Sequence, residues 1–300
     1  MVMAGEEKPI YKTISQSGRT KKLFYQMRYA IVHDKTGMAG FVILATIIVL
    51  SIISPVVFPI DRTADVTAIL QGPSKTHILG TDYLGQDVWA QVANGGRELL
   101  LFALVAALIG TALGVIMGTF APLIGGKFDE GVRIFADVWM SVPRLPLLVV
   151  LAGFTELTSM KLAIILGVLS WAGLYRTIRS QVLSLKESEF IEAAQMLNLS
   201  KAHIVFKEMV PNIMGFITVN FTLLMRGCIY SQVGLVFMGL LPMEQNWGVM
   251  INMAWRQGAV YNPSTIAYIL SPTIMICLLI VSLVWVGNAL EDVFNPELRR

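Results

Sequence analysis

The feature that most constrains this chain is a series of six apolar stretches, each long enough to cross a lipid bilayer as a helix. A hydrocarbon core about 30 Å thick requires about 20 helical residues. Inside lipid a helix satisfies its own backbone polar groups, which an open strand cannot do. We therefore predict an all-α, polytopic membrane protein with six transmembrane helices, at residues 37–60, 99–121, 134–157, 162–180, 213–240 and 266–290. Only 14% of the residues are charged, against about 25% in soluble domains, so lipid is expected around most of the surface.

The basic residues predict how these spans are oriented. Of the 23 lysines and arginines, 16 lie before the first span, in the loops after the second and fourth spans, or in the tail. Because basic residues accumulate on the cytoplasmic side, both termini are predicted to be cytoplasmic, in a multi-pass protein of the cell membrane. The predicted organisation is a cytoplasmic segment (1–36), a first transmembrane helix (37–60), an extracellular loop (61–98), a core transmembrane domain (99–290) and a cytoplasmic tail (291–300). Within the core we expect a cytoplasmic loop at 181–212 and an extracellular segment at 241–265.

The sequence offers no signature of an enzyme. The nearest approach to a phosphate-binding loop has no hydroxyl residue after its lysine: Gly125, Gly126, Lys127 and Phe128. The three histidines show no metal-ligand spacing, and the two cysteines lie in apolar stretches, as inert thiols do. No basic run interleaved with aromatic residues indicates nucleic-acid binding. We predict a non-enzymatic membrane component that holds no metal and no cofactor of its own.

The loop at 181–212 interrupts the apolar pattern with two short helices. The first carries four small or apolar residues at helical spacing, Phe190, Ala193, Ala194 and Leu197. Asn198 is suited to a left-handed C-cap and Ser200 to an N-cap, and Pro211 is predicted to end the second helix. The loop could be a solvated connector or a docking element for another protein. An exposed apolar stripe on a short helix favours docking.

This loop resembles the EAA motif of ABC importer permeases, written E-A-A-x3-G-x9-I-x-L-P. Glu192, Ala193, Ala194 and Pro211 match the motif at its spacing. Asn198 stands for the glycine, Glu208 for the isoleucine and Val210 for the leucine. Asparagine also tolerates a left-handed backbone, so the substitution is mild. The resemblance implies that Glu192, Ala193, Ala194, Asn198, Ser200 and Pro211 form the contact with an ATPase subunit.

A second stretch resembles one subgroup of these permeases. GPSKTHILGTDYLGQD, residues 72–87, is similar to the P-S-x-x-H-x-L-G-T-D-x-L-G-R-D signature of dipeptide/oligopeptide/nickel permeases of the second, C-type subunit, with Gln86 in place of the arginine. WGVM at 247–250 and the tail NALEDVFNPELRR resemble further segments of that family, which also includes oligosaccharide importers. The resemblance implies a type I ABC importer permease fold. The implied partners are a homologous second permease, two cytoplasmic ATPase subunits that bind ATP and magnesium, and an extracellular solute-binding protein.

A protein of another class, an ion-coupled secondary transporter, is the alternative. Such a transporter needs carboxylates within the membrane, and Asp137 and Glu156 are the candidates in the predicted spans. Both lie near the ends of their spans, which disfavours this alternative.

Two arginines lie near the middle of predicted spans. Arg144 in the third span and Arg226 in the fifth would each cost at least about 2.5–3.5 kcal/mol unless they face a polar interior. Pro143 and Pro146 flank Arg144 and are predicted to break its helix. Two explanations stay open: the arginines line a water-filled translocation path, or they pair with carboxylates of the partner permease.

The predicted extracellular segments are longer than simple connections require, and long loops tend to be functional. We expect them to shape a mouth that faces the solute-binding protein. The candidate receptor-facing residues are Thr81, Asp82, Asp87 and Trp247. For the first three, a purely local role in capping turns is an equally good explanation.

Overall fold

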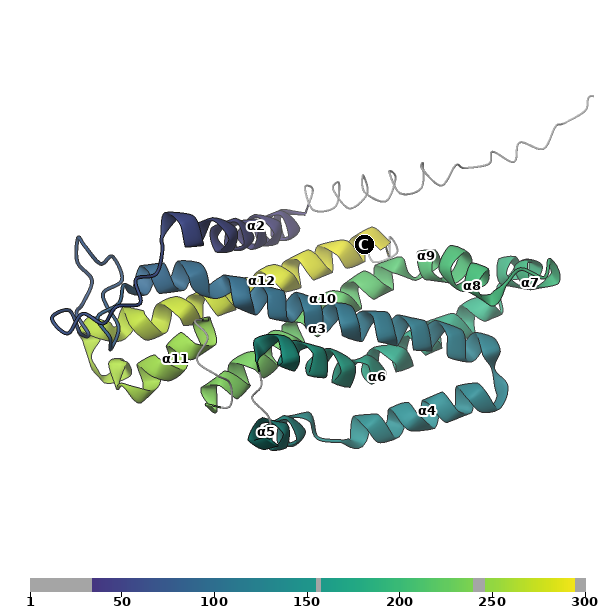
Figure 1. Cartoon of the computed structure of the whole chain (residues 1–300). Coiled ribbons are helices and arrows are strands. Elements are labelled where there is room, and N and C mark those ends of the chain that lie inside the picture. The colour runs from purple at the N-terminus through teal and green to yellow at the C-terminus, as the bar shows by residue number, and fades with distance from the viewer. Residues whose placement is uncertain (1–33, 155–157, 240–245, 295–300) are drawn as a thin grey trace, which may run out of the picture.

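The computed structural model describes residues 34–154, 158–239 and 246–294, and within them the regular elements are helices. Five long helices run side by side: α2 (Lys35–Val57), α3 (Val88–Ile124), α6 (Ser159–Lys186), α10 (Met214–Phe237) and α12 (Ile266–Phe294) (Figure 1). The predicted all-α class is confirmed. Most of the predicted segments 1–36 and 291–300, and residues 240–245 of the predicted segment 241–265 and its flank, lie outside the described residues.

The number of membrane spans depends on two bent helix pairs. Four of the long helices, α2, α3, α6 and α12, are each long and apolar enough to cross a bilayer. In the first bent pair α4 (Gly126–Ser141) meets α5 (Arg144–Phe154) at 73°, and in the second the helical residues 201–212 meet α10 at 75°. If each pair is one span, the total is the six that the sequence predicts. The break between α4 and α5 lies at Pro143, as predicted.

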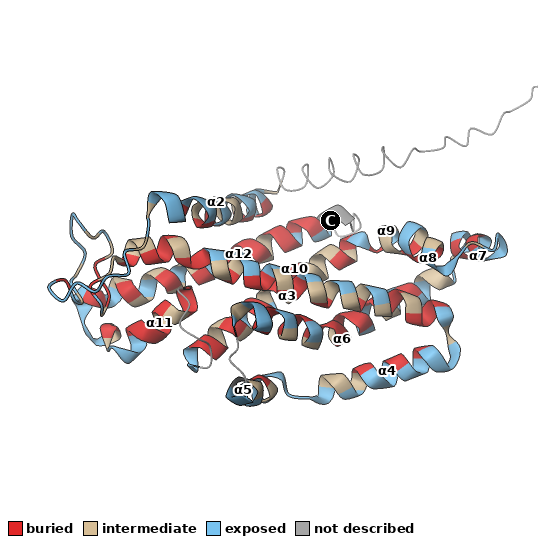
Figure 2. Ribbon diagram, viewed as in Figure 1, coloured by how far each residue is buried: buried red, intermediate tan, exposed pale blue. Residues whose placement is uncertain are grey.

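The bundle is built around the contact between α3 and α6. Glycines on α3 let the two helices approach closely: a Cβ added to Gly114 would lie 2.9 Å from a Leu174 side-chain carbon, and one added to Gly118 would lie 2.7 Å from Ile178 Cβ. From the other side, a Cβ on Gly167 would lie 2.8 Å from the backbone oxygen of Ala106. Such small-residue faces allow tight helix packing in lipid. The faces that α3, α6, α10 and α12 turn toward one another are correspondingly buried (Figure 2).

The outer surface of the bundle is strongly apolar. On α2 the side chains of Ile52 and Val56 are 68% and 83% exposed, and on α5 Phe154 is 86% exposed. Extended exposed apolar faces are rare on soluble monomers. Lipid or a partner chain is therefore the expected surroundings of these helices.

The two ends of the bundle differ. One end, the long-loop end, contains residues 58–87, α11 (Trp247–Arg256) and two 3₁₀ turns, η2 (Ala259–Tyr261) and η3 (Pro263–Thr265). The other, the short-helix end, contains α7 (Glu189–Met196), α8 (Lys201–His203), a π-helix η1 (Ile204–Met209) and α9 (Val210–Asn212) (Figure 1). In the π-helical part the amide of Val210 bonds to the carbonyl of Val205, five residues back.

Two predicted boundaries are wrong. The loop predicted at 61–98 ends earlier, because α3 begins at Val88, where the Asp87 side chain accepts a hydrogen bond from the Ala90 amide at 3.0 Å. This first part of α3 is polar enough to escape a search for apolar runs. The helix predicted to end at Pro211 continues to Asn212, because a proline is accommodated in the first turn of α9.

A matched pair of glycines on α6 tests the helix contact. We expect Gly167→Ala to destabilise the protein by about 1–3 kcal/mol, because its Cβ would press on the α3 backbone. The measurement is thermal unfolding of the detergent-purified chain, where each kcal/mol corresponds to about 2–4 °C. Gly173→Ala is the control on the same helix, since its Cβ would meet nothing within 4 Å. An equal loss of stability in both variants would contradict this account of the packing.

Candidate functional sites

The short-helix end carries a folded two-helix unit attached to the bundle. On α7, Ile191 and Ala194 are 0% and 6% exposed. They pack in one cluster with Val205 and Met209 of the second helix and with Ile178 of α6. The unit therefore shares one hydrophobic core with the ends of α3 and α6, which a solvated connector would not need.

The turn between the two short helices has the predicted geometry. Asn198 adopts a left-handed backbone with φ of 53°, and its amide bonds to the Gln195 carbonyl at 2.9 Å. The Ser200 hydroxyl accepts a hydrogen bond from the His203 amide at 3.2 Å and caps the second helix. The local predictions for Asn198 and Ser200 are confirmed as geometry, while their role toward a partner stays a prediction.

The predicted apolar stripe on α7 is wrong in one member. Ala194 faces the protein's own core, since it lies one turn from the buried Ile191. Glu192 and Ala193 are exposed. The exposed apolar residues of the unit are Phe190, Met196, Leu197 and Phe206, with exposed fractions of 42%, 75%, 73% and 56%. The predicted stripe did not include Met196 and Phe206, which a count of all exposed apolar residues over both helices would have found.

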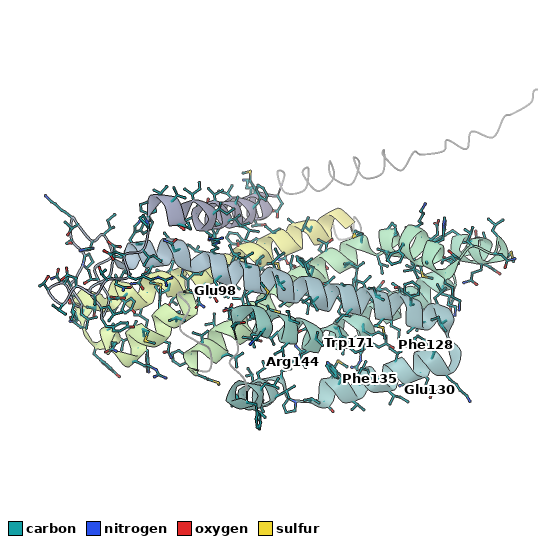
Figure 3. The ribbon with its side chains drawn as sticks, viewed as in Figure 1. Glu98, Phe128, Glu130, Phe135, Arg144 and Trp171 are labelled. Atoms are coloured by element: carbon teal, nitrogen blue, oxygen red, sulfur yellow. The ribbon has the colours of Figure 1, made fainter. Side chains whose placement is uncertain are left out.

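A second candidate site is a cavity of about 270 Å³ between α5, α6 and α10. Arg144 lines it at the start of α5, beside the break with α4 (Figure 3). Its other polar lining residues are Ser170, Thr177, Asn220 and Ser231. The sequence carries a signal for them that the prediction missed: Asn220, Gly227 and Ser231 recur on one face of α10, at helical spacing.

Arg226 does not line this cavity, so the structure does not bring the two arginines together there. Its side chain is partly buried, and its Nε has no hydrogen-bond partner among the residues that the structure describes. The two predicted roles of Arg226 both remain predictions.

Two aspartates of α4 form ion pairs with arginines of α6. Asp137, which a secondary transporter could use, lies 2.6 Å from Arg176 Nη2. Asp129 accepts two hydrogen bonds from Arg179, at 2.7 and 2.6 Å, in the bidentate geometry that makes such pairs strong. Phe135 stacks on Trp171 with ring centroids 6.0 Å apart (Figure 3). Glu156 lies outside the described residues.

At the long-loop end, the Asp82 carboxylate accepts hydrogen bonds that hold the loop together. It is 3% exposed. One carboxylate oxygen accepts the amides of Leu84 and Gln86, both at 2.8 Å, and the other accepts Gln91 Nε2 at 2.7 Å. Thr81 is buried beside it: its hydroxyl donates to the Ala68 carbonyl and accepts the Gln71 amide at 2.9 Å.

Two glycines that flank Thr81 and Asp82 in the sequence allow segments of the long loop to pass close to one another. Gly80 and Gly85 have φ of 80° and 78°, in the left-handed region that favours glycine. A Cβ on Gly85 would lie 2.1 Å from the Asp65 carbonyl oxygen, and one on Gly80 would lie 2.3 Å from that of Gln71. The L-G-T-D-Y-L-G sequence thus determines the backbone conformation of this loop.

The other two candidate receptor-facing residues also hold this end together. Asp87 caps α3, and His77 Nδ1 lies 2.8 Å from its carboxylate. Trp247 is fully buried, and its indole N–H donates to the Val92 carbonyl at 2.7 Å. Thr81, Asp82 and Trp247 therefore shape the surface from beneath and present no side chain of their own to a partner. A receptor-facing role for these four residues stays a prediction that would act through the loop shape.

Replacing Asp82 tests its role in the loop. We expect Asp82→Ala to cost about 1–3 kcal/mol for each buried donor that it leaves unpaired. The loss should be local, because the donors lie in the loop and in the first turns of α3. Hydrogen exchange of residues 58–91 measures it, and Lys75→Ala, at an exposed side chain of the same loop, is the control. Unchanged protection in the Asp82 variant would contradict the assignment.

Comparison with known proteins gives consistent matches over nearly the whole chain. Residues 110–300 match the family model described as "Binding-protein-dependent transport system inner membrane component". The chain is 28% identical to the oligopeptide transport system permease protein OppC of Haemophilus influenzae, over 92% of this chain and 89% of that protein. It is 30% identical to OppC of Bacillus subtilis, over 89% of this chain and 87% of that protein, and 30% identical to the dipeptide transport system permease protein DppC of the same organism, over 89% and 83%.

Proposed function

Because this chain belongs to the family of binding-protein-dependent transport system inner membrane components and is a permease subunit of an ABC importer, we propose that its cargo is a short peptide. The observation that carries the proposal is similarity over about nine-tenths of the chain to permeases named for oligopeptides and dipeptides. The 270 Å³ cavity with its arginine, serine, threonine and asparagine side chains offers a polar surface suited to peptide groups.

We infer that the chain works as half of a translocation pathway. The other half is a homologous second permease, and two cytoplasmic ATPase subunits bind ATP and magnesium. An extracellular solute-binding protein delivers the peptide. This chain supplies no ATPase site, since it lacks a phosphate-binding loop, and the energy of hydrolysis reaches it through protein contacts.

Reconstitution tests the proposal. The complex that co-purifies with the tagged chain is placed in proteoliposomes with its binding protein, and uptake of a radiolabelled tripeptide is measured. We expect uptake that requires ATP and is blocked by vanadate. Uptake of an oligosaccharide or of nickel in place of the peptide would overturn the cargo assignment. Uptake driven by an ion gradient without ATP would support the secondary transporter.

The two-helix unit at the short-helix end is proposed as the ATPase contact. Its exposed apolar residues lie beside the exposed Glu192 and Ala193. Of these apolar residues, Phe206 also packs edge-on against Phe120 of α3. Such a surface suits a groove in another protein. Ala194, Asn198, Ser200 and Pro211 then act by shaping the unit.

Two adjacent alanines separate these roles. We expect Ala193→Trp to leave the melting temperature unchanged and to reduce peptide-stimulated ATPase activity of the complex at least tenfold, because the bulky side chain blocks docking. Ala194→Trp should instead destabilise the chain by about 1–3 kcal/mol through overpacking. Normal ATPase coupling in Ala193→Trp would contradict the docking assignment.

The proposed orientation places the short-helix end in the cytoplasm with both termini, and the long-loop end outside. Lys75 lies in the exposed part of the long loop. A cysteine introduced by Lys75→Cys should react with a membrane-impermeant thiol reagent in intact cells. A cysteine at Lys201, in the two-helix unit, is the control and should react only after the membrane is opened. The reverse pattern would invert the topology.

Arg144 is proposed to face the translocation path, since it lines the cavity. We expect Arg144→Gln to change the uptake rate or the peptide preference several-fold with unchanged subunit composition. The same assay applied to Arg226→Leu distinguishes its two roles. Loss of the partner permease during purification indicates an interchain pair, and altered transport in an intact complex indicates a path residue. If Arg226→Leu changes neither the subunit composition nor the transport, both roles are refuted.

A further inference from the structure

A separate cavity of about 690 Å³ lies at the long-loop end. It is enclosed by the loop after α2, the beginnings of α3 and α12, and α11, and it shares no lining residue with the Arg144 cavity. Its volume is within the range of about 300–1,000 Å³ that small-molecule sites occupy. The lining residues used below are Arg62, Tyr83, Glu98, Met250 and Met253.

The floor of this cavity includes two methionines of the hydrophobic core. Met250 and Met253 lie one turn apart on the inner face of α11 and are 2% and 8% exposed. The buried Trp247 fixes the start of α11 by its bond to Val92. Methionine side chains are flexible and polarisable, and they recur at surfaces that accept varied partners. Two methionines on one face of α11 therefore suit ligands whose side chains differ.

The cavity also contains charges of both signs. Glu98 of α3 lies toward the long-loop end (Figure 3), and its carboxylate accepts hydrogen bonds from Ser159 Oγ and, at 3.4 Å, from Asn246 Nδ2. Arg62 is exposed on the loop, and no ion pair of its side chain is present among residues 34–154, 158–239 and 246–294. An arginine fork binds a carboxylate in two parallel hydrogen bonds.

Tyr83 adds a neutral hydroxyl to the same wall. Burial, and secondarily the nearby Asp82 carboxylate, raise the pKa of this phenol, which is already a protonated hydrogen-bond donor at neutral pH. Asp82 itself is fully engaged by the loop amides and by Gln91, so it belongs to the scaffold.

We propose that this cavity is a receiving site for a short peptide of variable sequence, outside the Arg144 cavity. Arg62 faces the peptide carboxylate, Glu98 faces the peptide ammonium group, and the methionine floor accommodates the side chains. The proposal rests on the proposed peptide function, because a free peptide is the ligand class that combines both terminal charges with unspecified side chains.

Photocrosslinking tests the proposal in the complete transporter, held in lipid nanodiscs without its binding protein. The probe is a tripeptide with p-benzoylphenylalanine between two alanines, and the crosslinked residues are mapped by mass spectrometry. We expect crosslinks at Met250 or Met253 that excess trialanine removes. At subsaturating probe, Arg62→Gln should lower the yield about tenfold, as should the C-terminal amide of the probe with the unmodified protein. Once the amide is used, Arg62→Gln should have no further effect.

Arg97→Gln is the matched control, since Arg97 is exposed on α3 at the same end but does not line the cavity. Crosslinks confined to the Arg144 cavity, or a yield insensitive to both Arg62→Gln and amidation, would overturn the receiving site. ATP-driven uptake of the same tripeptide separates this failure from that of the proposed function. Uptake without crosslinks at α11 removes the receiving site alone, whereas absence of uptake with the binding protein present removes the peptide cargo and the receiving site with it.

Discussion

The close contact of α3 with α6 is the interaction on which the rest of the structure depends. In a bilayer, apolar side chains gain little free energy when they move from lipid into a helix interface, because both are apolar. Helix association therefore relies on close packing. The glycines of both helices bring the backbones together, and α3 is long enough to reach both ends of the bundle. At one end its first turns anchor Trp247 and the long loop, and at the other Leu123 joins the cluster that holds the two-helix unit.

This arrangement gives a physical connection between regions far apart in the sequence. The Asp82 loop and α11 are fixed to the beginning of α3, while the two-helix unit is fixed to the ends of α3 and α6. The larger cavity is lined in part by α3, and the Arg144 cavity is lined in part by α6. A change in the packing of α3 and α6 against α10 or α12 would therefore move the elements attached at both ends of the bundle.

Much of the fold could be predicted because a chain that crosses lipid can adopt few backbone structures. Apolar runs identify the spans, and the α4–α5 break follows from two prolines around Arg144. The caps at Asn198 and Ser200 follow from local backbone chemistry. The burial of Ala194 could not be predicted, since a small residue fits either an inner or an outer helix face. Nor could the roles of Thr81, Asp82 and Trp247 at the long-loop end: polar or aromatic residues in a loop suggest contact with a partner until their internal hydrogen bonds are known.

The π-helical turn between Ile204 and Met209 has a consequence for the angular phase of the chain. A residue added within a helix without a break rotates everything after it by about 100°, one residue's share of an α-helical turn. The Asn212 side chain bonds to the Glu208 carbonyl at 2.6 Å, just before the bend into α10. Within the helical residues 201–212, before the 75° bend into α10, this turn therefore sets the direction in which the second helix of the two-helix unit presents its outer face. Shortening this turn by one residue would rotate that outer face about the helix axis, relative to the residues that lead into the bend, while leaving every side chain of the face in place.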